Sequence, residues 1–252
     1  MQKSSQKRGN IMKKKLTIII PCYNEEKGIG KVIQAIPKKE LAKKGYAVHV
    51  LVVDNNSTDA TQAKAKQVGA EVIFEKKRGK GYAVRTAIKH ISQDTDLVVM
   101  LDGDNTYDPK EMLRLIEPLD AGFCDVVIGS RLTGKIAKGS MSKFNRVGNW
   151  FFTFMVRAWY HENVTDVCTG YFAWKKPVLK ELSKYLEADG FALEMEMITK
   201  MARMRFNIFS VPISYKKRAG ETNLKPIADG KKILHAWVRN LTWKPYAESE
   251  GG

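Results

Sequence analysis

The residues with the clearest chemical potential are two carboxylates, Asp102 and Asp104, which follow the apolar run 98–101 and flank Gly103. A buried strand that ends in this way places both acids at the edge of a sheet, where ligands bind in open α/β folds. Such a pair can share one divalent cation, because Mg²⁺ is commonly held by one or two carboxylates together with substrate phosphates. An Asp-Gly turn whose acids only cap backbone groups is the structural alternative, and these residues alone leave both interpretations open.

Polar residues also follow other predicted strands, and in a parallel sheet these strand ends lie along one edge. They are Tyr23, Asn24 and Glu25 after the first strand, Asp54 after the second and Arg131 after the fifth. Each could serve only as a cap or a turn residue. Together with the two aspartates they predict an acidic and aromatic crevice with cations nearby, as expected of a nucleotide and metal site.

Short apolar runs alternate with helical stretches along the chain, which predicts βαβ units and a mostly parallel central sheet flanked by helices. The predicted strands are 16–20, 48–53, 71–75, 96–102, 125–128, 168–174 and 208–215. The predicted helices include one that ends near residue 35 and then 60–68, 82–91, 109–119, 141–160, 177–186, 192–204 and 227–241. The polar, glycine-punctuated stretch 132–139 is predicted to be a flexible loop.

The size and composition of the chain favour one α/β domain. Its 252 residues suit a single large α/β fold, and a hydrophobic share of 44% is enough to build a full core. We expect a basic flexible tail over residues 1–15, the folded domain over 16–241 and a polar C-terminal tail over 242–252. No apolar run reaches the roughly 18 residues that a transmembrane helix needs, so none is expected.

The formal net charge of +16 predicts an anionic partner, which could be nucleic acid, an anionic membrane surface or a phosphorylated ligand. A lysine-rich surface is the simpler alternative. No helix-turn-helix, RRM, KH or zinc-finger pattern is present, so no nucleic-acid partner is expected, and a basic binding module without catalysis is the alternative from another functional class. Cys22, Cys124 and Cys168 are odd in number and widely spaced, which favours free thiols in a reducing compartment.

Two further stretches could contact phosphate or lipid. The Arg78-Gly79-Lys80-Gly81 turn could present backbone N–H groups and Lys80 to a phosphate, although it lacks P-loop spacing and a solvated basic turn is the alternative. Residues 149–160 hold six aromatics in twelve positions, which fits either a buried helix or a helix in the bilayer interface. A basic, amphipathic C-terminal part extends this pattern, so we expect peripheral contact with an anionic membrane.

Three motifs resemble the opening motifs of family 2 glycosyltransferases with the GT-A fold. They are Ile20-Pro21-Cys22-Tyr23-Asn24-Glu25-Glu26, Val53-Asp54-Asn55-Asn56-Ser57-Thr58-Asp59 and Leu101-Asp102-Gly103-Asp104. The stretches Gly79-Lys80-Gly81, Gly129-Ser130-Arg131 and 215–222 resemble the polyprenyl-phosphate branch, which includes dolichyl-phosphate mannose synthases and their archaeal and bacterial relatives. The resemblance covers residues 15–241.

The resemblance implies a single-domain GT-A (Rossmann-like) fold and an inverting, metal-dependent transfer from a nucleotide-sugar to polyprenyl or dolichyl phosphate. By motif match, Asp102 and Asp104 would bind Mg²⁺ or Mn²⁺ on the donor diphosphate, where the cation offsets the charge of the leaving group. The residues that it places at the nucleotide-sugar are Pro21, Tyr23, Glu25, Asp54, Lys80, Asp102 and Asp104. Such an enzyme is expected in the cytoplasm, peripherally on the cytoplasmic face of the membrane.

A lipid phosphate is already an anionic nucleophile, so positioning and charge neutralisation can replace the general base that a sugar hydroxyl needs. Arginines near the donor are therefore the candidates for the acceptor phosphate. They are Arg131 and Arg218, which match the family motifs, and Arg146, which lies at the start of the aromatic helix. Asp104, Arg131 and Arg218 are the predicted catalytic residues.

The donor sugar is the least determined part of the resemblance. After Asp104 the mannose synthases usually carry a Gln followed shortly by His and Pro, whereas this chain has Asn-Thr-Tyr-Asp-Pro at 105–109. It is closer to relatives that use UDP-GlcNAc or UDP-glucose, so a UDP-sugar is expected and GDP-mannose is the alternative. A soluble or polysaccharide acceptor would need a base carboxylate, and for Glu194 and Glu196 we favour a structural or sugar-contacting role.

Overall fold

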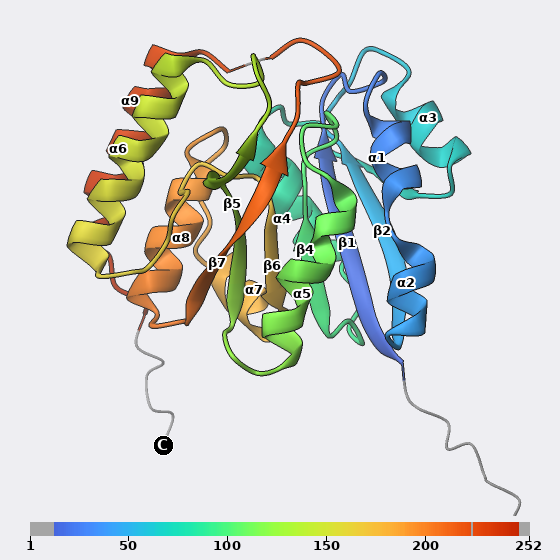
Figure 1. The fold of residues 1–252 in the computed structure, drawn as a ribbon, viewed down its shortest axis with the longest axis horizontal. Coiled ribbons are helices and arrows are strands. Elements are labelled where there is room, and N and C mark those ends of the chain that lie inside the picture. Colours follow the sequence, from blue (N-terminus) through green and yellow to red (C-terminus); the bar gives the residue numbers. More distant parts are fainter. Residues whose placement is uncertain (1–12, 223, 247–252) are drawn as a thin grey trace, which may run out of the picture.

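Seven strands form one sheet in the part of the chain that the computed structural model describes, residues 13–222 and 224–246 (Figure 1). They are β1 (Lys14–Cys22), β2 (Tyr46–Asp54), β3 (Glu71–Phe74), β4 (Leu97–Met100), β5 (Val126–Ile136), β6 (Phe172–Lys175) and β7 (Ile208–Tyr215). Their order is β3-β2-β1-β4-β6-β5-β7. Among these strands only β6 runs antiparallel to its neighbours, so the predicted mostly parallel sheet is confirmed.

Helices cover both faces of the sheet. They are α1 (Ile29–Ala35), α2 (Lys38–Lys43), α3 (Thr61–Gln67), α4 (Lys80–His90), α5 (Met112–Asp120), α6 (Lys143–Tyr160), α7 (Lys176–Ser183), α8 (Leu193–Arg203) and α9 (Pro226–Asn240), with a 3₁₀ turn at Pro109–Glu111. One face packs against α1, α2, α3 and α5, and the other packs against α4, α7 and α8. Helices α6 and α9 lie side by side outside α8 (Figure 1).

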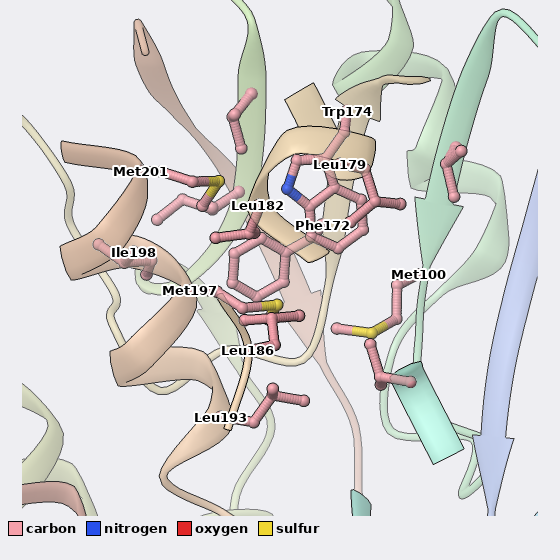
Figure 2. Packing of buried hydrophobic residues seen from close by; sticks show 14 of the residues in the cluster. Met100, Phe172, Trp174, Leu179, Leu182, Leu186, Leu193, Met197, Ile198 and Met201 are labelled. Atoms are coloured by element: carbon pink, nitrogen blue, oxygen red, sulfur yellow. The ribbon is translucent and has the colours of Figure 1, made fainter. Parts of the chain in front are cut away.

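The alternation of side chains along each strand divides the core into two halves. In β1, Ile18 and Ile20 point to the half covered by α1 and α5, whereas Ile19 points to the half covered by α4. The second half is filled by large side chains around β6 and α8, where the rings of Phe172 and Trp174 stack with centroids 5.0 Å apart (Figure 2). Both strand faces are thus buried, as β-branched runs without polar alternation require.

The structure departs from the sequence-based expectation in several places, among them the predicted strand 168–174, of which only 172–174 lie in β6. The predicted loop at 132–139 is wrong for residues 132–136, because β5 continues past a bulge and pairs again with β7. Gly134 permits this pairing, since a Cβ there would come within 1.9 Å of the Ile213 carbonyl oxygen. The short helix α2 was not expected at all. Strand β1 begins at Lys14, inside the predicted basic tail, and ion pairs link Lys14 to Asp120 and Lys15 to Asp94.

The two predicted tails lie mostly outside the described part of the chain, which omits residues 1–12 and 247–252. Of the C-terminal stretch, Trp243 packs its ring edge-on against Tyr185, with centroids 5.1 Å apart. In the described ranges, no helix combines the length and the apolar character that crossing a membrane requires.

Replacement of Phe172 by Ala is expected to lower the free energy of unfolding by about 3–5 kcal/mol, because it removes a fully buried ring and leaves a cavity against Trp174. Urea unfolding with a fixed m-value measures the change. Phe154→Ala on α6 is the matched control, since this ring is 55% exposed and its loss should change stability by about 0.5 kcal/mol or less. Equal losses in the two variants would contradict the packing described here.

Candidate active site

Two adjoining cavities open at the carboxyl edge of the sheet. The first, about 460 Å³, lies at the ends of β1, β2 and β4 and is lined by Pro21, Tyr23, Glu25, Asn55 and Arg78 among others. The second, about 750 Å³, extends from there between α6 and α9. Both are lined by Lys80, Asp102, Asp104, Phe191 and Arg218, so these side chains form the junction. Of the strand-end residues that the sequence singled out, five line these cavities, namely Tyr23, Glu25, Asp102, Asp104 and Arg131, whereas Asn24 and Asp54 line neither.

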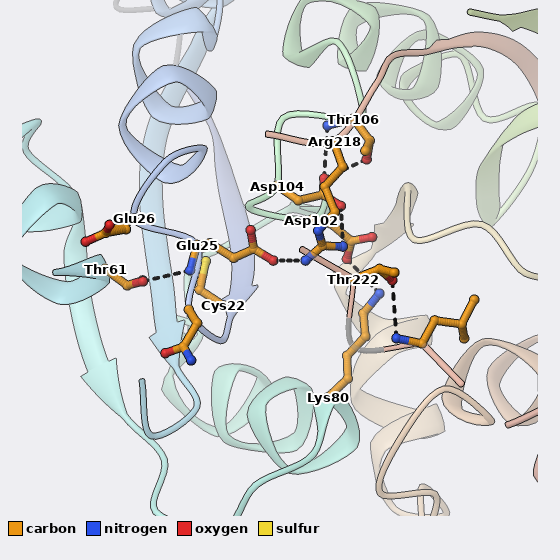
Figure 3. Close-up of polar contacts among 12 residues, drawn as sticks. Cys22, Glu25, Glu26, Thr61, Lys80, Asp102, Asp104, Thr106, Arg218 and Thr222 are labelled. Carbon is orange, nitrogen blue, oxygen red and sulfur yellow. Dashed lines mark hydrogen bonds and ion pairs between the residues drawn. The ribbon is translucent and has the colours of Figure 1, made fainter. Parts of the chain in front are cut away.

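The two aspartates at the junction are held by two cations from distant parts of the chain (Figure 3). Lys80, at the start of α4, places Nζ 2.6 Å from Asp102 Oδ1. Arg218, after β7, donates from Nη1 to Asp104 Oδ2 over 2.8 Å and from Nη2 to Glu25 Oε1. Burying carboxylates is costly without such partners, so these ion pairs fix the geometry of the junction.

Burial and neighbouring charges shift the pKa values of the ionisable side chains at and beside the junction. Burial raises the pKa of Asp104, as does Asp102, while Arg218 and hydrogen bonds from Thr106 oppose the shift. Burial likewise raises the pKa of Glu25 to about 8, against the opposing effect of Arg218. Burial lowers the pKa of Lys80, but its carboxylate neighbours outweigh this and leave the pKa raised, so its ammonium stays charged.

Glycines let backbone segments approach the junction closely. A Cβ on Gly28, which precedes α1, would lie 2.5 Å from the carbonyl oxygen of Gly103, so α1 begins directly against the segment that carries the aspartates. Gly79 has a φ of 138°, which an L side chain rarely adopts, and it starts α4 with Lys80 facing the junction. The alternative of a solvated basic turn is thereby excluded for Lys80, whose side chain is only 15% exposed.

The first cavity has an aromatic wall, and Asp54, which precedes its lining residue Asn55, is a buried acid. The guanidinium carbon of Arg78 lies 4.9 Å from the centre of the Tyr23 ring. Asp54, at the end of β2, is fully buried behind the cavity and does not line it. Its Oδ2 accepts hydrogen bonds from Ser57 N and Gln62 Nε2, whereas Oδ1 has no partner among the described residues. A buried acceptor without a partner is uncommon in folded proteins.

Arg131 lines the second cavity and is held by a residue that the sequence did not reveal. Asp166 accepts from Arg131 Nε over 2.7 Å, from Nη2 over 2.8 Å and from the backbone N–H over 2.9 Å. The guanidinium carbon also lies 5.3 Å from the centre of the Tyr215 ring. No pattern marked Asp166, because its partner lies 35 residues away in the sequence, with the whole of helix α6 between them.

Of the remaining candidates, Glu194 contacts the junction, whereas Glu196 and Arg146 line neither cavity. Glu194 is buried, lines the second cavity and pairs with Lys80 over 2.7 Å; burial raises its pKa, against the effect of Lys80. Glu196 is fully buried and lines neither of the two cavities. Arg146 is exposed on α6 and is not brought to either cavity, unlike Arg131 and Arg218.

A divalent cation at the junction would meet two carboxylates. Asp102 and Asp104 supply hard oxygen ligands two residues apart, which Mg²⁺ and Mn²⁺ prefer. Elsewhere in residues 13–222 and 224–246, as at the junction, no group of three or more His, Cys, Asp or Glu side chains is placed to hold a metal. The pair therefore fits a cation whose other ligands come from a bound diphosphate and water rather than from a complete protein cage.

Comparison with solved structures shows the same architecture. The chain superimposes on glucosyl-3-phosphoglycerate synthase from Mycobacterium tuberculosis, crystallised with Mn²⁺, UDP and phosphoglyceric acid, with a TM-score of 0.70. The match covers 93% of this chain and 80% of that one at 21% sequence identity. At this identity the likeness concerns the fold.

Comparison of sequences identifies the family. The chain is 35% identical to Glycosyltransferase AglJ of Haloferax volcanii over 231 residues, which is 90% of this chain and 73% of that protein. It is 34% identical to a dolichyl-phosphate hexose transferase of the same organism over 226 residues, 89% of this chain and 92% of that protein. The family model of glycosyl transferase family 2 matches residues 17–183. The chain therefore belongs to glycosyl transferase family 2 and is a glycosyltransferase.

Proposed function

We propose that this glycosyltransferase transfers a hexose or N-acetylhexosamine from a UDP-sugar to polyprenyl or dolichyl phosphate, with inversion at the sugar. The observation that carries the proposal is the pair of adjoining cavities that share Lys80, Asp102, Asp104 and Arg218. The first is lined by strand-end residues of the family motifs, and the second runs between the aromatic helix α6 and the basic helix α9. A donor in the first and a lipid phosphate in the second would react at the junction.

In the first cavity, Pro21, Tyr23 and Glu25 would contact the base and ribose, with the unpaired Oδ1 of Asp54 behind them. Lys80 lies at the junction, where it can face the donor diphosphate. The crystal structure of the synthase from M. tuberculosis contains UDP, which supports a uridine donor on this fold. The Haloferax relative named a dolichyl-phosphate hexose transferase supports the acceptor class.

Asp102 and Asp104 would hold Mg²⁺ or Mn²⁺, whose role when bound is to neutralise the charge that develops on the departing diphosphate. In the structure their charges are matched by Lys80 and Arg218. A cation bound to the carboxylates would take over that compensation. Lys80 and Arg218 could then turn to the phosphates of donor and acceptor, for which free ammonium and guanidinium groups are suited.

On the acceptor side, Arg131 and Arg218 line the second cavity and would position the lipid phosphate. A phosphate oxygen forms the new bond to the anomeric carbon while the bond from that carbon to the diphosphate oxygen breaks, so UDP leaves with the electron pair. No proton has to be removed, which fits a junction whose buried carboxylate Glu194 is already paired with Lys80. A hydroxyl acceptor with Glu194 as base is the second candidate, favoured by its burial and raised pKa.

The lipid would arrive from the surface formed by α6 and α9, here called the α6–α9 face. Its exposed large apolar side chains are Phe144, Val147, Trp150, Phe151, Phe154, Trp159, Ile227, Leu234 and Val238. Exposed basic side chains accompany them: Lys143, Arg146, Arg157, Lys231 and Lys232. Because Phe144, Ile227 and Leu234 also line the second cavity, that cavity opens on this face. We propose that the face docks on an anionic bilayer at the cytoplasmic side, with Arg146 at the headgroups rather than at the reacting phosphate.

Asp104→Asn is expected to lower kcat for sugar transfer on the order of a hundredfold or more, because it removes one of the two carboxylates placed for the cation. A radiolabelled-sugar assay with dolichyl phosphate and Mn²⁺ measures it. Asp108→Asn is the matched control: this acid lies four residues on and pairs with Lys216 away from the junction, at 2.9 Å. Full activity in Asp104→Asn with an unchanged melting temperature would contradict the metal assignment.

Thermal-shift measurements with Mn²⁺ should show a higher melting temperature with UDP-GlcNAc or UDP-glucose than with GDP-mannose, because only a ligand that binds the native state raises apparent stability. At a hundred times the dissociation constant the gain is about 2.7 kcal/mol. A shift with GDP-mannose alone would contradict the uridine donor but leave the transferase assignment in place.

Replacement of both Trp150 and Phe154 by Ser should weaken binding to phosphatidylcholine vesicles containing phosphatidylglycerol by about tenfold or more, because both exposed rings lose apolar burial in the interface. Co-sedimentation at moderate salt measures the partitioning. Phe123→Ser serves as the control, since Phe123 is exposed before β5 and packs edge-on against Phe209, away from the α6–α9 face. Equal binding of the double variant and wild type would exclude this face as the docking surface.

A further inference from the structure

A buried ion cluster on α8 belongs to neither cavity and has no part in the reaction proposed above. Its centre is Glu196, whose side chain is fully buried. Glu196 Oε1 lies 2.9 Å from Lys200 Nζ and 2.6 Å from Arg239 Nη2, which comes from the last turn of α9. Arg239 also reaches Glu187 through Nη1 at 2.9 Å. We call Glu196, Lys200, Arg239 and Glu187 the Glu196 cluster.

The second oxygen of Glu196 holds a stretch of backbone. Its Oε2 accepts hydrogen bonds from the N–H groups of Glu187 and Ala188, over 3.0 and 2.8 Å. With two cations on one oxygen and two backbone donors on the other, the carboxylate has four partners. Hydrogen bonds to a charged group are stronger than neutral ones, so the start of segment 187–191 is fixed to α8 and, through Arg239, to α9.

Segment 187–191 in turn shapes the donor side of the junction. The carbonyl oxygen of Asp189 accepts from Gly81 N over 2.9 Å, and Arg85 donates to the Ala188 oxygen over 2.8 Å. The contact is so close that a Cβ on Gly81 would lie 1.7 Å from the Ala188 oxygen. The end of the segment, Gly190 and Phe191, lines the first cavity. A displacement of the segment would therefore move the backbone on both sides of Lys80.

Helix α9 contacts Glu196 through Arg239 in its last turn, and its other end contacts the acceptor cavity. Ile227 and Lys231, in the first half of α9, and Leu234, just past its middle, line the second cavity. In its last turn, Asn240 donates to Thr199 Oγ1 over 2.8 Å beside the contact of Arg239 with Glu196. Helix α9 thus connects the acceptor cavity with the anchor of segment 187–191.

From this arrangement we propose that Glu196 and Arg239 are positioning residues that couple the placement of α9 to the donor cavity. The inference rests on the proposed function, because it assigns the first cavity to a nucleotide-sugar. The path runs from Arg239 to Glu196, from Glu196 to the backbone of 187–188, and from Asp189 to Gly81 next to Lys80. Neither residue touches the substrates, and both act through the segment that they hold.

The test is donor binding by Arg239→Gln, which removes one charge from a side chain that is 39% exposed and keeps the helix intact. Isothermal titration of the full chain with UDP and, in parallel, GDP, each with Mn²⁺, is expected to give a dissociation constant about five- to tenfold higher than wild type for the nucleotide that binds. Arg239→Lys should be intermediate, since an ammonium restores the charge but not both carboxylate contacts. Lys180→Gln, an exposed cation on α7 that lines neither cavity, should match wild type.

A purely structural cluster predicts another result. In that case Arg239→Gln would lower the melting temperature while the nucleotide dissociation constant stayed at the wild-type value, and this would overturn the coupling. Glu196→Gln gives an independent variant with the same two readouts. If wild type itself bound neither nucleotide, the proposed function would fail, and that result is distinct because it appears without any substitution.

Discussion

Charge compensation at the end of β4 is the constraint on which the site depends. Asp102 and Asp104 lie two residues apart at the carboxyl edge of the sheet, and Asp104 is almost fully buried. Isolated carboxylates cannot be buried at a tolerable cost, so cations must reach them. The two that do are Lys80, at the start of α4, and Arg218, in the segment after β7, so both come from elements remote from β4 in the sequence.

The same compensation explains why the junction is suited to group transfer. Buried ion pairs contribute little net stability, because desolvation offsets most of the attraction. Their partners can therefore be exchanged at modest cost when other charges of the same sign arrive. In the proposed reaction Asp102 and Asp104 would hold a divalent cation that supplies the positive charge, and Lys80 and Arg218 would be free to bind phosphate oxygens. Arg131 differs, because its bidentate contact with Asp166 holds the guanidinium in one orientation throughout.

The sequence predicted what depends on local pattern. Runs such as 16–20 identify buried strands, and the polar residues that follow them, Tyr23 and Asp102 among them, lie at one edge because parallel strands end on the same side. The direction of β6 was not predictable, since an apolar run fits a parallel or an antiparallel neighbour equally well. Arg146 was placed with the acceptor because of its position in the chain, whereas the helical turn directs it to the surface.

Contacts between distant residues set the limit of such prediction. Nothing in the local sequence connects Arg218 with Glu25, or Arg239 with Glu196, and each pair forms only when the fold brings the two segments together. Both pairs include a buried carboxylate whose burial follows from the packing of whole helices. The polar residues near the strand ends could therefore be named from the sequence, while the partners that hold them could not.

The position of the junction relative to the α6–α9 face has a consequence for the proposed lipid acceptor. In a bilayer the phosphate of such a lipid lies at the headgroup level, and its hydrocarbon chain lies deeper. A helix of 18 residues spans about 27 Å, so α6 lying along the interface would cover a wide area without entering the core. The second cavity opens on this face and ends at Arg218, so the phosphate could reach the donor while the chain stayed among the exposed side chains of α6 and α9. Docking of this face on a bilayer would then bring the proposed lipid phosphate to the junction.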